Sequence, residues 1–270
     1  MKRLFGLTWL AFASTVSMGA AQNRPLEQAR ELYNQHRYDA AIDAAGRAGR
    51  TPALIDAAAL VIARAHLERY REAGEASDLS IARETLAGID PARLLPRERA
   101  ELLVGWGELL YLDGRFGAAA EQFELGFGRG EEPTEARLLE WWASALNRQA
   151  QLAPPDARKA SYERMVQRME EELRRHAGST VASYWLVVAA RGAGDLQRAW
   201  DAAIAGWIRA PLSGEQAAAL RDGLDQLVRE AIIPERARRS PQPDDAKRTT
   251  AAMQAEWDAL KQAWTPKPPS

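Results

Sequence analysis

One pattern recurs three times along the chain, and it restricts the fold more than any other feature of the sequence. It reads LYNQHRYDAAIDAA at 32–45, LYLDGRFGAAAEQF at 110–123 and ARGAGDLQRAWDAA at 190–203. Each copy runs through helix-forming residues to a histidine or glycine, places an aromatic residue or leucine two positions later, and continues into alanines. This order is typical of two helices joined by a tight turn, so the chain is expected to be built of helix pairs.

The columns of the aligned copies have a physical explanation. The first column, His36, Gly114 and Gly194, ends a helix where the backbone must enter the left-handed region, which glycine adopts readily. The large residue two positions later is expected to fill the corner of the turn. Small residues follow where the two helices cross closely: Ala41, Ala119 and Ala199, and then Ala48, Gly126 and Gly206.

These copies resemble the tetratricopeptide repeat, a helix–turn–helix unit of about 34 residues with small residues at fixed positions. Pro211 falls where the family usually places a closing proline. His36 replaces the turn glycine in the first copy, Val187 occupies a position that is usually small, and the family's tryptophan is missing throughout. The resemblance implies an all-α fold, a right-handed α-solenoid of about five helix pairs with C-terminal capping helices.

Successive copies begin roughly 80 residues apart, which leaves room for two units of about 40 residues in each interval. Residues 53–73 with 78–90, and 134–150 with 156–176, have the composition expected of the intervening pairs. We therefore expect a repeat domain over 22–231, ending in a capping helix at 213–231 with Leu220, Leu224 and Leu227 on one face. A linker rich in proline and arginine follows at 232–245.

A last amphipathic helix is expected at 246–264, before a disordered tail at 265–270. It places Met253, Trp257, Leu260 and Trp264 on one face. This face could dock on the repeats, as a permanent cap or a self-inhibiting plug, or it could reach a partner.

The first residues have the layout of a secretory signal peptide over 1–21. A basic start is followed by an apolar run from Leu4 to about Val16 and by the small residues Gly19, Ala20 and Ala21. The expected location is therefore periplasmic or secreted. The sequence contains no cysteine, which excludes disulfides and a lipid-modified cysteine.

No catalytic residue, metal site or cofactor is predicted. The net charge of −1 provides no field for gathering nucleic acid. The three histidines, His36, His66 and His176, share no metal-ligand spacing, and the glycines of GFGRGEE at 126–132 lack the strand and the Lys-Ser or Lys-Thr of a phosphate loop. No nucleophile motif occurs.

The resemblance also implies a binding groove lined by the first helix of each pair. Transferring the family's groove positions to the three recognisable pairs gives Arg30, Tyr33, Glu108, Tyr111, Tyr184 and Arg191. Tyrosine at one column in two pairs is a plausible anchor, and the charges could set the orientation of a bound segment.

The predicted function is a non-enzymatic protein–protein interaction module, a scaffold or adaptor of the bacterial cell envelope, which binds a peptide or helix in its concave groove. One alternative is an all-helical periplasmic hydrolase acting on peptidoglycan or peptides. Another is a structural subunit of an outer-membrane assembly or secretion machine, which would require a large apolar interface.

Overall fold

The computed structural model describes residues 15–129, 132–239 and 242–264, and this part of the chain is helical without strands. It divides into two compact units, Met1–Leu112 and Asp113–Ser270, where the sequence had indicated one repeat domain over 22–231. The first 14 residues of the predicted signal peptide and the predicted tail at 265–270 lie outside the described residues. Residues 15–21 form the start of the first helix, α1.

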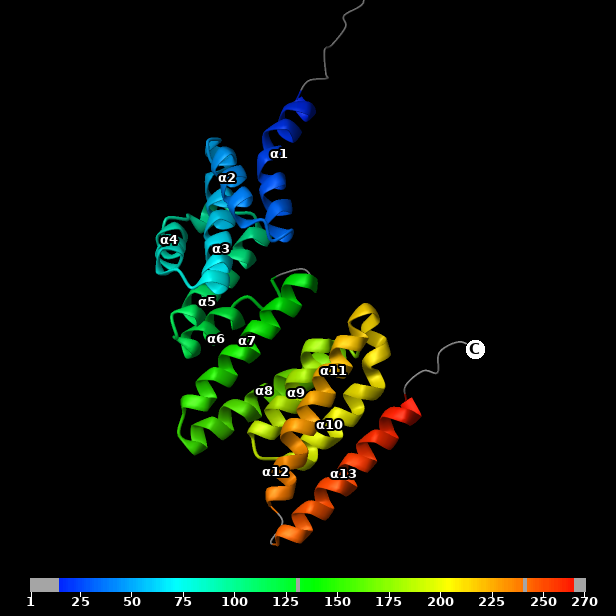
Figure 1. The fold of residues 1–270 in the computed structure, drawn as a ribbon. Helices are drawn as coiled ribbons and strands as arrows, with labels where there is room; N and C mark the ends of the chain where they lie inside the picture. Colours follow the sequence, from blue (N-terminus) through cyan, green and yellow to red (C-terminus); the bar gives the residue numbers. More distant parts are fainter. Residues whose placement is uncertain (1–14, 130–131, 240–241, 265–270) are drawn as a thin grey trace, which may run out of the picture. The chain divides into compact units, whose positions relative to one another are not determined.

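From residue 15 onward, the first unit consists of five α-helices and two short 3-10 turns, whose order along the chain can be followed in Figure 1. The helices are α1 (Thr15–Asn34), α2 (Tyr38–Ala48), α3 (Ile55–Ala73), α4 (Ala76–Ala87) and α5 (Pro96–Leu112), with η1 (Pro52–Leu54) and η2 (Pro91–Arg93) between pairs. Consecutive helices contact each other, and α3 also contacts both α1 and α5. The first helices of successive pairs therefore lie side by side in this unit.

Alanine dominates the core of the first unit. Ala44, Ala45, Ala48 and Ala58 are almost fully buried together with leucines of α3 and α4. Small side chains allow helix axes to approach closely, so the packing of this core depends on the absence of large groups at the helix crossings.

The second unit begins with a single helix, α6 (Phe116–Glu124), after the Gly114 corner. Two helix pairs follow, α7 (Glu132–Leu152) with α8 (Pro155–Arg175) and α9 (Thr180–Gly192) with α10 (Leu196–Arg209), and then come the 3-10 segment η3 (Ala210–Gln216) and α11 (Ala217–Leu227). Here too α9 contacts both α7 and α11, so first helices again neighbour first helices. The helix breaks predicted near Gly74 and at Pro154-Pro155 are confirmed.

The predicted turn geometry is confirmed at all three recognisable corners. The φ angles of His36, Gly114 and Gly194 are 59°, 76° and 86°, all in the left-handed region. At the first corner the Arg37 amide donates to the Leu32 carbonyl, and at the third the Asp195 amide donates to the Ala190 carbonyl. These bonds satisfy carbonyls that the end of a helix would otherwise leave unpaired.

The small-residue columns are also confirmed. Ala41, Ala119 and Ala199 have no exposed surface. A Cβ added at Gly126 would lie 2.9 Å from a methyl group of Leu138, and one added at Gly206 would lie 3.0 Å from a methyl group of Leu224. These glycines are needed for close approach between helices.

The end of the chain differs from the prediction. The helix expected over 213–231 starts at Ala217, passes through a π-helical segment η4 (Val228–Ile232) and continues as α12 (Ile233–Arg238). The last helix, α13 (Pro243–Trp264), starts three residues before the expected 246. Most of the segment 232–245 is therefore helix rather than linker.

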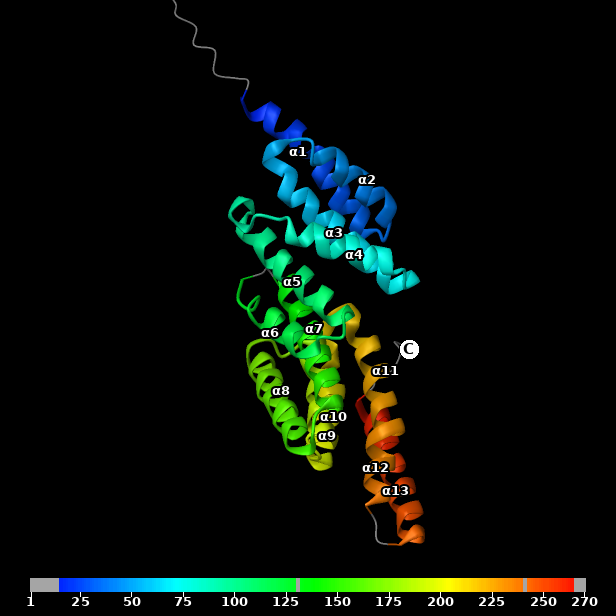
Figure 2. The ribbon, with the colours of Figure 1, turned by 90° about the vertical axis from the view of Figure 1, so that its left-hand side faces the viewer.

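Proline explains this difference. Pro243 is the first residue of α13, a position where the missing N–H breaks no helical bond and the fixed φ suits the helix. Pro234 is the second residue of α12, and the helical run continues through it from the π-helical segment. Figures 1 and 2 both show α13 alongside α12 within the second unit, and α13 also contacts α10.

Candidate functional site

The groove residues predicted in the first unit are engaged with neighbouring helices. Arg30 on α1 pairs with Glu98 on α5, with 2.6 Å between Nη2 and Oε1. The hydroxyl of Tyr33 on α1 donates to Oε1 of Glu68 on α3 at 3.2 Å. These side chains hold the first helices of three successive pairs against one another.

Glu108 is buried rather than presented to solvent. It lies 3.8 Å from the Nε atom of Arg64, and only 2% of its side chain and 8% of that of Arg64 are exposed. The Arg64 guanidinium also lies over the ring of Tyr33, 4.9 Å from the centroid. Burial lowers the pKa of Arg64, but Glu108 and the neighbouring Tyr33, Glu101 and Glu68 together outweigh burial and raise the pKa overall. Tyr111, one turn further along α5, is half-buried.

The two groove residues predicted in the second unit, Tyr184 and Arg191, line one cavity of about 520 Å³. The cavity lies among α7, α8, α9 and the run from α11 to α12. Its wall consists of Asn147, Gln151, Arg158, Tyr162, Tyr184, Trp185, Val188, Arg191, Gly192, Leu227 and Glu235. Tyr162 and Glu235 belong to the wall although the sequence analysis did not single them out.

Aromatic side chains form the apolar part of the cavity wall. Tyr162 is 5% exposed and its hydroxyl donates to Oδ1 of Asn147 at 2.8 Å. The ring of Tyr184 meets that of Trp185 edge-on, with 5.7 Å between centroids. Burial raises the pKa of both tyrosines, and at Tyr184 the charge of Glu140 raises it further. Both phenols are therefore neutral at physiological pH and can offer hydrogen bonds.

A single hydrogen bond fixes Trp185 in this wall. Its indole N–H donates to Oε2 of Glu140 at 2.9 Å, which ties α9 to α7. Desolvation raises the pKa of Glu140, and the bond from Trp185 acts in the opposite direction.

Charged groups form the polar part of the wall. The Arg191 guanidinium donates from Nε to Oε1 of Glu235 at 2.9 Å, and the two side chains are 35% and 26% exposed. Arg158 donates to the carbonyls of Ala150 and Ala153, each at 3.2 Å, near the end of α7. The Arg191–Glu235 pair is accessible to solvent, whereas the Arg64–Glu108 pair of the first unit is buried.

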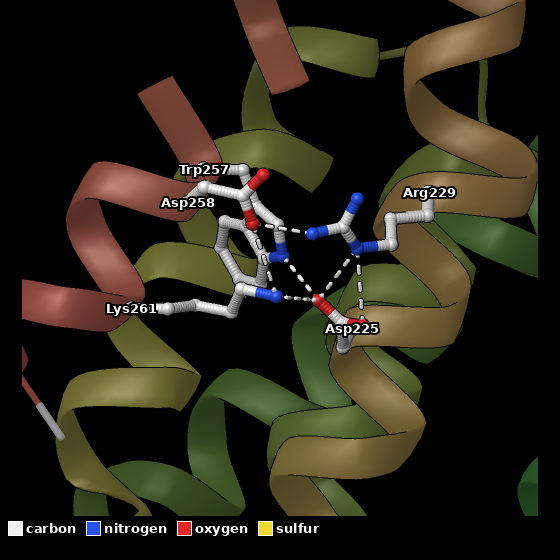
Figure 3. Close-up of polar contacts among 5 residues, drawn as sticks. All are labelled: Asp225, Arg229, Trp257, Asp258 and Lys261. Carbon is white, nitrogen blue, oxygen red and sulfur yellow. Dashed lines mark hydrogen bonds and ion pairs between the residues drawn. The ribbon is translucent and has the colours of Figure 1, made fainter. Parts of the chain in front are cut away.

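A second polar cluster fastens α13 to α11 (Figure 3). The Asp225 carboxylate accepts from the indole N–H of Trp257 at 2.7 Å, from Nζ of Lys261 at 2.6 Å and from Nε of Arg229 at 3.0 Å. Arg229 also pairs with Asp258, and Lys261 lies 3.2 Å from the same carboxylate. Two acidic and two basic side chains thus surround one indole.

The predicted apolar face of α13 is only partly buried. Met253 and Trp257 are 7% and 0% exposed, Leu260 is half-buried and Trp264 is 52% exposed. The ring of Trp257 packs on the tryptophans of α10, with centroid distances of 5.8 Å to Trp200 and 5.4 Å to Trp207. In this structure α13 therefore docks on its own chain.

Spacing alone could have suggested parts of this cluster. Asp225 and Arg229, and likewise Trp257 and Lys261, are four residues apart and so share a helix face. Whether these two helix faces contact each other depends on the tertiary fold, and spacing along the sequence does not predict it. Glu235 was missed because its segment was interpreted as a linker.

The histidines have structural surroundings. Nδ1 of His66 lies 2.6 Å from Oδ1 of the buried Asp78, and Nδ1 of His36 lies 2.7 Å from the hydroxyl of Tyr38. Within the described residues no three histidine, aspartate or glutamate side chains are grouped as metal ligands would be.

Comparison of the chain with protein-family models, with curated proteins and with solved structures gives no match.

Proposed function

We propose that this chain is a non-enzymatic protein-interaction module built from tetratricopeptide-like helix pairs. The left-handed corners at His36, Gly114 and Gly194 support this proposal, as do the buried small residues that follow them. In each unit the first helices of successive pairs are neighbours, an arrangement that a helical solenoid requires. On this proposal the pairs form a solenoid, with α11 to α13 as its C-terminal cap.

The partner-binding site of this proposal is the cavity of the second unit. The observation that carries it is that Tyr184 and Arg191, chosen from sequence alone as groove residues, line one cavity together with Tyr162 and Trp185. Aromatic walls with a few oriented polar groups are typical of sites that bind a peptide or a small molecule. In the first unit, Arg30, Tyr33 and Glu108 are engaged internally and contribute less to this proposal.

The ligand that suits this wall is a peptide segment or helix of a protein partner. The Asn147 and Gln151 amides can bond main-chain groups, the tyrosine and tryptophan rings can cover an apolar side chain, and the exposed arginine can fix orientation. The cavity has room for one or two side chains, so a short segment would be the recognised element.

The location we propose is the periplasm or the outside of the cell, because the first 21 residues have the layout of a signal peptide. Among the described residues no helix has the length and apolar character needed to cross a bilayer. Cell fractionation of the tagged chain would test this: a precursor that shortens on export supports it, and an uncleaved chain that remains in the cytoplasm contradicts it.

The binding site can be tested by crosslinking in intact cells that express the tagged chain, followed by mass spectrometry. The wild type is compared with Tyr184→Ala and Arg191→Gln. Arg175→Gln is the matched control, because it also removes an arginine from an ion pair of the second unit, one that lies outside the cavity wall. Loss of one adduct in both cavity variants but not in the control supports the site, and an unchanged adduct pattern contradicts it.

A further inference from the structure

The cavity and the docking site of α13 share one helical run. Leu227 and Glu235 on this run line the cavity. Asp225 and Arg229 on the same run hold α13. Within the eleven residues from 225 to 235, contacts to α13 and contacts to the cavity therefore alternate along the sequence.

The middle of this run departs from α-helical geometry. Residues Val228–Ile232 are π-helical, and Pro234 follows two residues later. Single-turn π segments are found mostly at functional positions, and a proline lacks the N–H for a helical bond, so this stretch is the place where the run can bend. Val228 and Ile232 are fully buried, so their packing transmits such a bend to the core of the second unit.

The ion pair between Arg191 and Glu235 fixes the far end of the run. It joins α12 to α9 across the cavity mouth, and both side chains are accessible to a ligand. Arg236 also donates to Gln197, and Arg239 donates to the Gly194 carbonyl, so a ligand that takes over the Arg191 guanidinium loosens α12 rather than detaching it.

The attachment of α13 is suited to opening without unfolding of the rest. Only Met253 and Trp257 of its apolar face are buried, and Trp264 at its end is half exposed. Polar contacts also hold α13, namely the cluster around Asp225 and the hydrogen bond from Arg221 to the Trp264 carbonyl, and their groups can be resolvated on opening. Segments with few buried apolar contacts open at a lower free-energy cost than the core.

We infer that α13 is a releasable latch whose docking is coupled to the cavity through the run from α11 to α12. A partner segment that draws Arg191 away from Glu235 loosens α12, and α13 loses part of the surface on which it packs. Linkage requires the converse, that release of α13 alters the affinity of the cavity. The biological meaning of this latch rests on the proposed function, whereas the coupling itself is a property of the chain without ligand.

Hydrogen exchange of the full, ligand-free chain, read by mass spectrometry, tests the coupling. Glu235→Gln breaks the ion pair at the cavity, and Lys261→Gln weakens the latch directly. Arg175→Gln removes a comparable pair outside both places. We expect Lys261→Gln to accelerate exchange in α13, and Glu235→Gln to accelerate it as well, by roughly two- to fivefold, with α8 unaffected. The control should leave α13 at the wild-type rate.

Three results would overturn the inference. If Glu235→Gln leaves hydrogen exchange of α13 unchanged, the cavity and α13 are not coupled. If Lys261→Gln leaves it unchanged, the polar cluster does not hold α13 as a latch. An equal acceleration from α7 to α13 shows that α13 does not open separately. None of these results bears on whether the cavity binds a partner, which the cellular crosslinking decides independently.

Discussion

The indole N–H of Trp257 donates to Oδ1 of Asp225 at 2.7 Å, and this bond joins the last helix of the chain to α11. The same carboxylate accepts from Lys261 and Arg229, so one acidic group coordinates three donors from two helices. Because Trp257 also packs on Trp200 and Trp207, the bond fixes the position of the aromatic ring that closes the end of the second unit.

Asp225→Asn should loosen α13. The neutral amide loses the charge that attracts Lys261 and Arg229, and we expect the free energy of unfolding of the second unit to fall by roughly 1–3 kcal/mol. Denaturant unfolding followed by tryptophan fluorescence measures this. Asp222→Asn, an exposed change on the same helix, should stay within about 0.5 kcal/mol of the wild type. Equal effects of the two variants would contradict the assigned role of Asp225.

The docking of α13 should weaken in acid. Desolvation by itself raises the pKa of Asp225, but the hydrogen bonds from Lys261, Trp257 and Arg229 outweigh it, so the pKa lies below its ordinary value of 3.8. A carboxyl group with a lowered pKa in the folded state stabilises that state above its ordinary pKa. This contribution is lost as pH falls through the lowered value.

An acid titration of tryptophan fluorescence, with wild type and Asp225→Asn compared, checks this sign. We expect a change at Trp257 below about pH 4 in the wild type that is absent from the variant. A wild-type change centred well above that pH would contradict the assignment to Asp225.

The shape of the cavity depends on Gly192. A Cβ at this position would lie 2.5 Å from the ring of Tyr162, which must then move. Gly192→Ala should reduce stability by roughly 1–3 kcal/mol and lower the pKa of Tyr162 toward its ordinary value, as seen by ultraviolet titration. Gly223→Ala places its Cβ 3.5 Å from the ring of Tyr184, an ordinary contact, and should be neutral or slightly stabilising. The reverse order of the two variants would contradict the described wall.

Backbone conformation, rather than space, should decide glycine substitutions in the first unit. Gly74 ends α3 with a φ of 74°, whereas Gly46 lies inside α2, and a Cβ at either would meet nothing within 4 Å. Gly74→Ala should cost about 1 kcal/mol and Gly46→Ala should gain about 0.5–1 kcal/mol. Thermal unfolding of the two variants measures both; a similar sign for both would refute the conformational explanation.

The corners and crossings of the helix pairs could be predicted from the sequence because local chemistry determines them. A glycine in a left-handed turn and an alanine at a close crossing act within one helix pair. The roles of Gly194 and Ala199 can therefore be predicted from the local sequence. The ends of α11 to α13 could not be predicted in the same way. Pro234 and Pro243 were interpreted as linker residues, although Pro243 begins α13, where proline is compatible with a helix, and the run through Pro234 stays helical.

The candidate site likewise combines residues that local patterns predict with contacts between distant segments that they do not predict. Tyr184 and Arg191 were placed through a family position, and the cavity brings them together. Glu235, which pairs with Arg191, comes from a helix more than forty residues later, and no local pattern links the two. Similarly, Asp225 and Trp257 meet only because α13 folds back on α11, a long-range contact that periodicity cannot reveal.

The proposed site is tested most directly by a photoreactive amino acid at Gln151, an exposed residue of the cavity wall, in the full chain expressed in living cells. We expect one major adduct whose partner peptide maps to position 151 and which disappears when Tyr184→Ala is added. A photoreactive residue at the exposed Gln149 on the same helix, which lies outside the cavity wall, should not give this adduct. The same adduct from both positions, or an adduct from Gln151 that persists in Tyr184→Ala, would contradict binding at this cavity.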